Sequence, residues 1–329
     1  MPALITTRIL QAIPVLLVVA FIAFMLFAFV GNPVSIMLGQ DATAAQQQAM
    51  VHQLGLDQPI VVQYARFVWR ALHGDFGISY RLARPVSGLL MERLPATVEL
   101  AAVATVLALA IGLPMGVYTG IRRHSPFARL FLGLSLVGVS LPTFLIGILL
   151  ILVFSVWLQW LPSFGRGDVV RLGWWSTGLL TQSGRKALVL PAITLAMFQM
   201  ALITRLVRAE MLEVMRADFI KFARARGLSD RAVNFGHALR NTLVPVVTIT
   251  GLQFGLVVAF SIITETVFQW PGIGLLLVQS IAVADVPVMS AYLLLIAVVF
   301  VTINLVVDIL YFVVDPRLRV DRGAATGGR

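Results

Sequence analysis

The side chains that carry most enzyme chemistry are few in this sequence and lie far apart. The four histidines stand at positions 52, 73, 124 and 237, and no two of them have the spacing of metal ligands. Neither of the two lysines, Lys186 and Lys221, follows the glycine pattern G-x-x-x-x-G-K-[ST] that binds nucleotide phosphates. Cysteine is absent, which excludes disulfides, iron–sulfur clusters and thiolate sites. The sequence therefore predicts no catalytic, cofactor-binding or metal site in this chain.

Three acidic residues, Glu99, Glu265 and Asp308, are the candidates for coupling transport to an ion. An ion-coupled transporter or channel is expected to place carboxylates near the middle of the bilayer. These three stand at the ends of apolar segments, which favours solvated or capped side chains. A membrane-embedded enzyme would need paired carboxylates, a histidine cluster or an activated serine, and the sequence offers none.

The most informative polar segment is a basic one at residues 218–231, between two apolar segments. Apolar residues recur every three or four positions and predict a helix that starts near Glu210 and carries one apolar stripe, formed by Leu212, Met215, Phe219 and Phe222. Gly227 suits the left-handed position that ends a helix, and Ser229 suits the N-cap of a second, short helix. The segment has two interpretations, an amphipathic loop lying on anionic lipid and a knob that docks into a soluble partner.

The elements around this segment are apolar. The chain has 329 residues, 59% of them hydrophobic and 12% charged, whereas soluble domains have about 25% charged residues. Six segments approach or exceed the roughly 20 apolar residues that cross a bilayer. They are residues 9–30, 100–118, 130–158, 187–204, 243–264 and 286–307. The first is too long for the apolar region of a signal peptide, which favours a retained membrane anchor.

The charges predict the orientation of these spans. An N-terminus inside the cell places most of the 25 Lys and Arg residues in cytoplasmic segments. These are Arg8, the group Arg122, Arg123 and Arg129, eight between 205 and 240, and four from Arg317 onward. The net charge of +10 thus reflects membrane topology, and nucleic acid is not an expected partner. The predicted fold class is all-α, a polytopic membrane protein with six helices and both ends in the cytoplasm.

A series of short motifs runs along nearly the whole chain. The series comprises Leu54-Gly55-Leu56-Asp57-Gln58-Pro59, Gly74-Asp75-Phe76-Gly77-Ile78-Ser79, Leu94-Pro95-Ala96-Thr97-Val98-Glu99-Leu100, Ser140-Leu141-Pro142-Thr143-Phe144, Leu161-Pro162-Ser163-Phe164-Gly165, Ala223-Arg224-Ala225-Arg226-Gly227-Leu228-Ser229, His237-Ala238-Leu239-Arg240-Asn241, Glu265-Thr266-Val267-Phe268, Pro271-Gly272-Ile273-Gly274 and Asp315-Pro316-Arg317. Together, in this order, these motifs resemble one family, the membrane permeases of binding-protein-dependent ABC importers in their dipeptide/oligopeptide branch. The stretch just before Gly227 departs from the wider superfamily at two positions, because Lys221-Phe222-Ala223 stands where that superfamily has Glu-Ala-Ala ahead of the glycine.

The resemblance implies a type I importer permease fold in the bacterial cytoplasmic membrane. It implies a homologous second permease, two ATP-binding subunits that hold ATP and magnesium, and an extracytoplasmic solute-binding protein, with membrane lipid around the spans. This chain would bind no cofactor itself. The implied divisions are residues 1–30 with the first span, an extracytoplasmic loop at 31–95, a five-helix core at 96–314 with the docking loop at 209–240, and a cytoplasmic tail at 315–329.

The resemblance also assigns candidate sites. The loop that couples to the ATPase would consist of Phe222, Ala223, Arg224, Ala225, Arg226, Gly227, Leu228, Ser229, Asp230 and Arg231. Candidates for the pathway or its gate are Gln253, Ser261, Glu265, Pro271 and Gly272, although hydrogen bonding between helices is the simpler role for Gln253 and Ser261. The implied cargo is dipeptides or oligopeptides; glutathione, nickel chelates and oligosaccharides are the alternatives within the same architecture.

Overall fold

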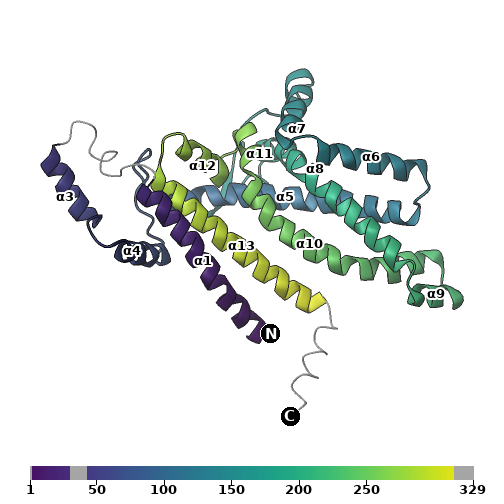
Figure 1. Cartoon of the computed structure of the whole chain (residues 1–329). Helices are drawn as coiled ribbons and strands as arrows, with labels where there is room; N and C mark the ends of the chain where they lie inside the picture. Colours follow the sequence, from purple (N-terminus) through teal and green to yellow (C-terminus); the bar gives the residue numbers. More distant parts are fainter. Residues whose placement is uncertain (1, 30–42, 315–329) are drawn as a thin grey trace, which may run out of the picture. The chain divides into compact units, whose positions relative to one another are not determined.

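The computed structural model describes residues 2–29 and 43–314, and most of these residues are helical (Figure 1). A short two-stranded ribbon, β1 (Val170–Leu172) and β2 (Trp175–Thr177), lies in their longest non-helical stretch, residues 158–181. Residues 30–42 of the expected extracytoplasmic loop and the expected tail at 315–329, with its Asp315-Pro316-Arg317 motif, lie outside the described residues.

Five helices in the described ranges are long and apolar enough to cross a membrane. Four of them begin and end as α1 (Pro2–Phe29), α5 (Val86–Ile121), α8 (Gln182–Val214) and α13 (Val286–Val314). The fifth candidate span covers Ala232–Val267 and includes α10 (Leu239–Phe260) and α11 (Ile262–Val267). The all-α prediction is therefore confirmed, and each of these helices contains or largely overlaps one of the expected spans.

The sixth expected span, residues 130–158, does not form one uninterrupted helix. The chain forms α6 (Pro126–Ser140), breaks at Leu141 and Pro142, and continues as α7 (Thr143–Leu150) and the π-helical segment η1 (Ile151–Trp157). Pro142 has φ −58° and ψ 136°, which is not helical, and a proline also disfavours the helical conformation of the residue before it. The apolar helix after the break, Thr143–Trp157, is shorter than the five candidate spans.

The chain divides into two compact units. The first consists of Met1–Thr97, Arg171–Ser176 and Pro271–Val301. It holds α1, α3 (Ala44–Leu54), α4 (Ile60–Leu72) and α12 (Ile273–Ile281). Its apolar cluster joins three helices, since Ala20 and Ala23 of α1 and Leu294 of α13 pack with side chains of α4.

The second unit consists of Val98–Val170, Thr177–Trp270 and Thr302–Arg329, and α8 is its central helix. α6, α7 and α10 pack on α8. α5 approaches α8 closely because glycines recur at every fourth position: a Cβ atom at Gly116 would lie 2.5 Å from Val207 Cβ, and one at Gly120 would lie 2.7 Å from Met211 Cβ. Small residues at this spacing let two membrane helices pack backbone to backbone.

Candidate functional site

The basic segment predicted to be a docking or lipid-contacting loop lies in the second unit, where α8 and α10 meet α9 (Asp218–Ala225) (Figure 1). The single helix expected from Glu210 does not form, since α8 ends at Val214 and Ala217 is extended, with φ −66° and ψ 149°. Asp218 opens the new helix, where a carboxylate is favoured by the helix dipole. Lys221 Nζ pairs with Asp218 Oδ1 at 2.8 Å on the exposed side of this short helix.

Gly227 ends α9 in the conformation that the sequence predicts. Its φ is +76°, in the left-handed region that glycine adopts at little cost. The N–H of Gly227 donates to Arg224 O at 2.9 Å, and the N–H of Leu228 donates to Ala223 O at 3.3 Å. This pair of bonds is a Schellman motif, which satisfies carbonyls at the end of the helix and fixes the direction of the chain that leaves it.

Ser229 starts the next helix, as expected, because its Oγ accepts a hydrogen bond from Ala232 N at 3.4 Å. The second helix is not a separate short one. The chain remains helical from residue 230 to Phe260, first through the π-helical segment η2 (Ala232–Ala238) and then through α10. The corner at Gly227 therefore leads, after two further residues, into a helix that continues to Phe260.

The exposed side of α9 is aromatic and basic. Ile220 and Ala223 are buried, and α9 packs against η2. Phe222 is 65% exposed and Phe219 is 45% exposed, so the expected apolar stripe faces outward at these two positions. The guanidinium of Arg226 lies 5.8 Å from the centre of the Phe222 ring, in cation–π geometry. Among residues 222–231 only Ala223 is buried, and the remaining nine are exposed.

The candidate pathway residues are divided between the two units. Gln253 is half-buried on α10, and Ser261 and Glu265 are buried one helical turn apart. The Ser261 hydroxyl lies 3.0 Å from both Val258 O and Glu265 Oε1, so its donor is used locally. Pro271 and Gly272 belong to the first unit, where Gly272 is the N-cap residue of α12.

A buried ion pair that the sequence did not reveal lies in the second unit. Glu99, expected to be solvated or capped, is 4% exposed and accepts a hydrogen bond from Arg166 at 2.8 Å. The N–H of Gly178 also donates to this carboxylate at 3.1 Å, and the Arg166 guanidinium lies 5.9 Å from the ring centre of buried Trp270. These contacts join α5 to the chain before α8. No local pattern around Arg166 could have identified its partner.

The first unit has a second buried carboxylate, Asp285, just before α13. It accepts hydrogen bonds from the Ser79 hydroxyl and from the N–H groups of Tyr80 at 3.1 Å and Arg81 at 3.3 Å. Burial, together with the Asp285 charge, raises the pKa of Tyr80 to about 12. The carboxylate anchors the 79–81 turn to the start of α13.

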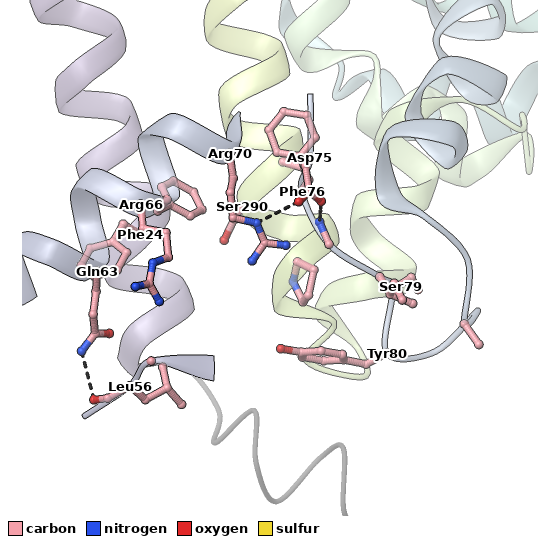
Figure 2. Close-up of a pocket in the computed structure, with 17 residues that line it drawn as sticks. Phe24, Leu56, Gln63, Arg66, Arg70, Asp75, Phe76, Ser79, Tyr80 and Ser290 are labelled. Carbon is pink, nitrogen blue, oxygen red and sulfur yellow. Dashed lines mark hydrogen bonds and ion pairs between the residues drawn. The ribbon is translucent and has the colours of Figure 1, made fainter. Parts of the chain in front are cut away.

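A cavity of about 490 Å³ lies beside this turn in the first unit. Figure 2 shows Gln63, Arg66 and Arg70 of α4 on its wall, with Tyr80 and Ser290. Arg70 Nε pairs with Asp75 Oδ2 at 2.9 Å. That hydrogen bond and one from Gly77 N–H lower the pKa of Asp75 below its ordinary value. In residues 2–29 and 43–314 no group of three or more His, Asp or Glu side chains is placed to hold a metal ion.

These features define a multi-helix membrane protein with an exposed basic corner between two of its helices. The fold is similar to that of a chain of the MetNI methionine ABC transporter, solved in inward-facing conformations, with a TM-score of 0.56 at 20% sequence identity over 69% of this chain and 96% of that one. It is the fold of type I ABC importer permeases.

Two family models match the chain: the binding-protein-dependent transport system inner membrane component over residues 112–320, and the N-terminal part of such components over residues 1–101. The chain belongs to this family of transport permeases. Its members are permease subunits of ABC transporters and not catalytic enzymes, and the family implies ATPase, binding-protein and second-permease partners.

Curated relatives match nearly the full chain. A putative peptide transport system permease protein of Brucella abortus (strain 2308) is 42% identical over 324 residues, covering 98% of this chain and all of the relative. The dipeptide transport system permease protein DppB of Escherichia coli (strain K12) is 39% identical over 319 residues, covering 91% and 94%. The di/tripeptide transport system permease protein DppB of Pseudomonas aeruginosa (strain UCBPP-PA14) is 39% identical, covering 98% and 100%.

Proposed function

We propose that this chain is a permease subunit of an ATP-driven importer that carries dipeptides and oligopeptides across the bacterial cytoplasmic membrane. The observation that carries the proposal is the near-complete alignment at 39–42% identity with permeases named for peptide or dipeptide transport. The complex contains this chain, a homologous second permease, two ATP-binding subunits and an extracytoplasmic solute-binding protein. Both termini of the chain lie in the cytoplasm.

The test of cargo uses the solute-binding protein that works with this permease. Calorimetric titration with dipeptides, tripeptides, glutathione, a nickel chelate and an oligosaccharide should give tight binding for the peptides alone. Tight binding of a non-peptide and none of the peptides would reassign the cargo but leave the importer architecture intact.

ATP and magnesium bind on the partner ATPase subunits, and this chain binds no cofactor. The reason is chemical: its two lysines do not belong to a phosphate-binding loop. Purified alone, the chain should hydrolyse no ATP above background, and hydrolysis should appear when the ATPase subunits are added. Robust hydrolysis by this chain alone would refute the division of labour.

Residues 222–231 form the surface that couples to an ATPase subunit, within a docking segment at 209–240. Two properties of the described segment support this role. Phe222 and Arg226 are exposed beside one another, which is typical of an interface anchor, and the Schellman motif at Gly227 fixes the corner rigidly. Because the helix is continuous from residue 230 into α10, closure of the ATPases would tilt a membrane helix and favour one of two transport states.

The remaining assignments follow from this architecture. Residues 1–30 form the cytoplasmic end with the first span, residues 31–95 an extracytoplasmic region that receives the binding protein, residues 96–314 the permease core and residues 315–329 a cytoplasmic tail.

The candidates for the pathway or its gate are Gln253, Ser261, Glu265, Pro271 and Gly272. Cysteine substitution at half-buried Gln253, followed by labelling during turnover with a thiol reagent that does not cross the membrane, tests this role. Substrate-dependent labelling supports it, and labelling unaffected by substrate contradicts it.

A further inference from the structure

Helix α4 has an apolar surface wider than its neighbours cover. Eleven of its 13 residues form three faces at helical spacing, and no residue of the helix is fully buried. The packed face consists of Tyr64, Phe67, Val68 and Ala71. The polar face consists of Gln63, Arg66 and Arg70, which border the cavity of Figure 2. The third face consists of Val61, Ala65, Trp69 and Leu72 and is exposed.

The exposed face is strongly apolar. Val61 is 72% exposed, Trp69 64% and Leu72 77%. Scattered single apolar residues are ordinary on a protein surface, but three large ones aligned on one helix face indicate a partner. A tryptophan in such a row is typical of the membrane–water interface.

The contacts of α4 with α1 place this face at the level of the bilayer. The Tyr64 hydroxyl donates to Leu17 O of α1 at 2.8 Å, and the Tyr64 ring packs on Phe21 and Phe24. Leu17 lies about 18 Å before the end of α1 at 1.5 Å per residue, well inside a helix apolar enough to span the membrane. Tyr64 of α4 therefore contacts α1 within the residues that are apolar enough to cross a membrane, and not beyond the end of that helix.

Helix α1 also exposes large apolar side chains near its contact with α4. Leu17, Val18 and Phe21 are exposed on α1, at the same level as Tyr64 of α4. Such residues on a membrane-spanning helix face hydrocarbon. A helix with one apolar and one cationic side, packed against a span at this depth, has the properties of an interfacial helix.

We propose that α4 is embedded in the outer leaflet of the membrane, where Val61, Trp69 and Leu72 contact phospholipid hydrocarbon. The long side chains of Arg66 and Arg70 then extend from α4 toward the headgroups, and the cavity opens toward water. The inference rests on the proposed N-in orientation, and it changes the expected role of this part of the 31–95 region from aqueous loop to membrane contact. The solute-binding protein would then contact α4 only on the side that borders the cavity.

Spin labelling of the assembled transporter in lipid nanodiscs tests the proposal directly. The chain has no cysteine, so single labels can be placed in complexes whose other subunits are also cysteine-free. Labels at Val61→Cys and Leu72→Cys probe α4 at two sites. Val18→Cys on α1 is the lipid reference, and Asp57→Cys, just before α4, is the water reference.

Power-saturation measurements compare collisions of each label with oxygen and with a water-soluble nickel(II) chelate. The α4 labels should resemble Val18, with an oxygen-to-nickel ratio several-fold above that of Asp57. Nickel access equal to Asp57 would overturn the proposal in favour of an aqueous face, and exclusion of both reagents would overturn it in favour of a protein partner. A Val18 label that itself reports water would refute the membrane placement of α1 and the inference together.

Discussion

The corner at Gly227 gives the sharpest prediction about how the chain couples to its ATPases. A Cβ atom added at this glycine meets no other atom within 4 Å, so a substitution is not opposed by a steric clash within this chain. The cost arises from the backbone, because Gly227 has φ +76° and an L-residue in the left-handed region costs roughly 1–2 kcal/mol, most for β-branched side chains. That free energy lowers the ratio of molecules with the native conformation at residue 227 to molecules with another conformation there by about 5- to 30-fold.

Two variants separate the backbone effect from the loss of glycine itself. Gly227→Val should reduce ATP-driven peptide uptake several-fold in proteoliposomes that hold the full transporter. Gly227→Asn should retain most of the uptake, because asparagine tolerates the left-handed conformation. Immunoblotting must show equal insertion of both variants, since the corner lies outside the membrane-spanning part of the chain.

Two results would refute this reasoning. Uptake by Gly227→Val at the wild-type rate would show that the left-handed corner is not needed for coupling. An equal loss in Gly227→Asn and Gly227→Val would show that conformation is not the reason for the glycine, and would favour direct contact of the partner with the bare backbone.

Three further predictions concern the exposed face of α9, the buried ion pair of Glu99 with Arg166, and Tyr80 beside the buried Asp285. Phe222→Ala should weaken co-purification with the ATPase subunits without lowering the melting temperature of the isolated chain, because the ring is 65% exposed. Arg166→Ala should lower the stability of the chain by about 3–5 kcal/mol, since it leaves the buried Glu99 charge unpaired, and thermal unfolding in detergent measures this. The stability contributed by Tyr80 should be complete below pH 10.0 and lost as pH rises toward about 12, because the folded state raises its pKa and so resists ionisation of the phenol.

Each of these has a matched control. Phe164→Ala removes another exposed aromatic and should leave ATPase co-purification unchanged. The double variant with Arg166→Met and Glu99→Gln should recover much of the stability that Arg166→Ala loses, because no unpaired charge remains; no recovery would contradict the ion-pair explanation. Tyr80→Phe should abolish the alkaline loss of stability between pH 10 and 12, and an unchanged pH profile would assign that loss to other groups.

The features that the sequence predicts correctly depend on neighbours close in the chain. Apolar run length predicts the long helices, and the left-handed glycine at 227 and the cap at Ser229 are local backbone chemistry. Pro142 is a local signal for the break between α6 and α7. The apolar run at residues 130–158 continues across this proline, however, and so predicts one uninterrupted helix. Burial of Ile220 in place of Phe219 depends on packing against η2, which the spacing of apolar residues does not specify.

The features that the sequence did not predict join distant residues. Glu99 and Arg166 are 67 positions apart, and Ser79 and Asp285 are 206 positions apart. Neither carboxylate differs locally from a solvated acid at the end of a span. The exposed apolar face of α4 also depends on distant residues. The amphipathic pattern of this helix is visible in the sequence, but only its contacts with α1 and α13 show which apolar residues stay uncovered.

Reconstitution tests the proposed function most directly. Proteoliposomes that contain this chain, its partner permease and both ATPase subunits should accumulate a labelled dipeptide when ATP is inside the vesicle and the loaded binding protein is outside. Uptake should cease when this chain, ATP or the binding protein is omitted. Dipeptide uptake that persists without ATP, or without the binding protein, would contradict the assignment of this chain to a binding-protein-dependent ABC importer.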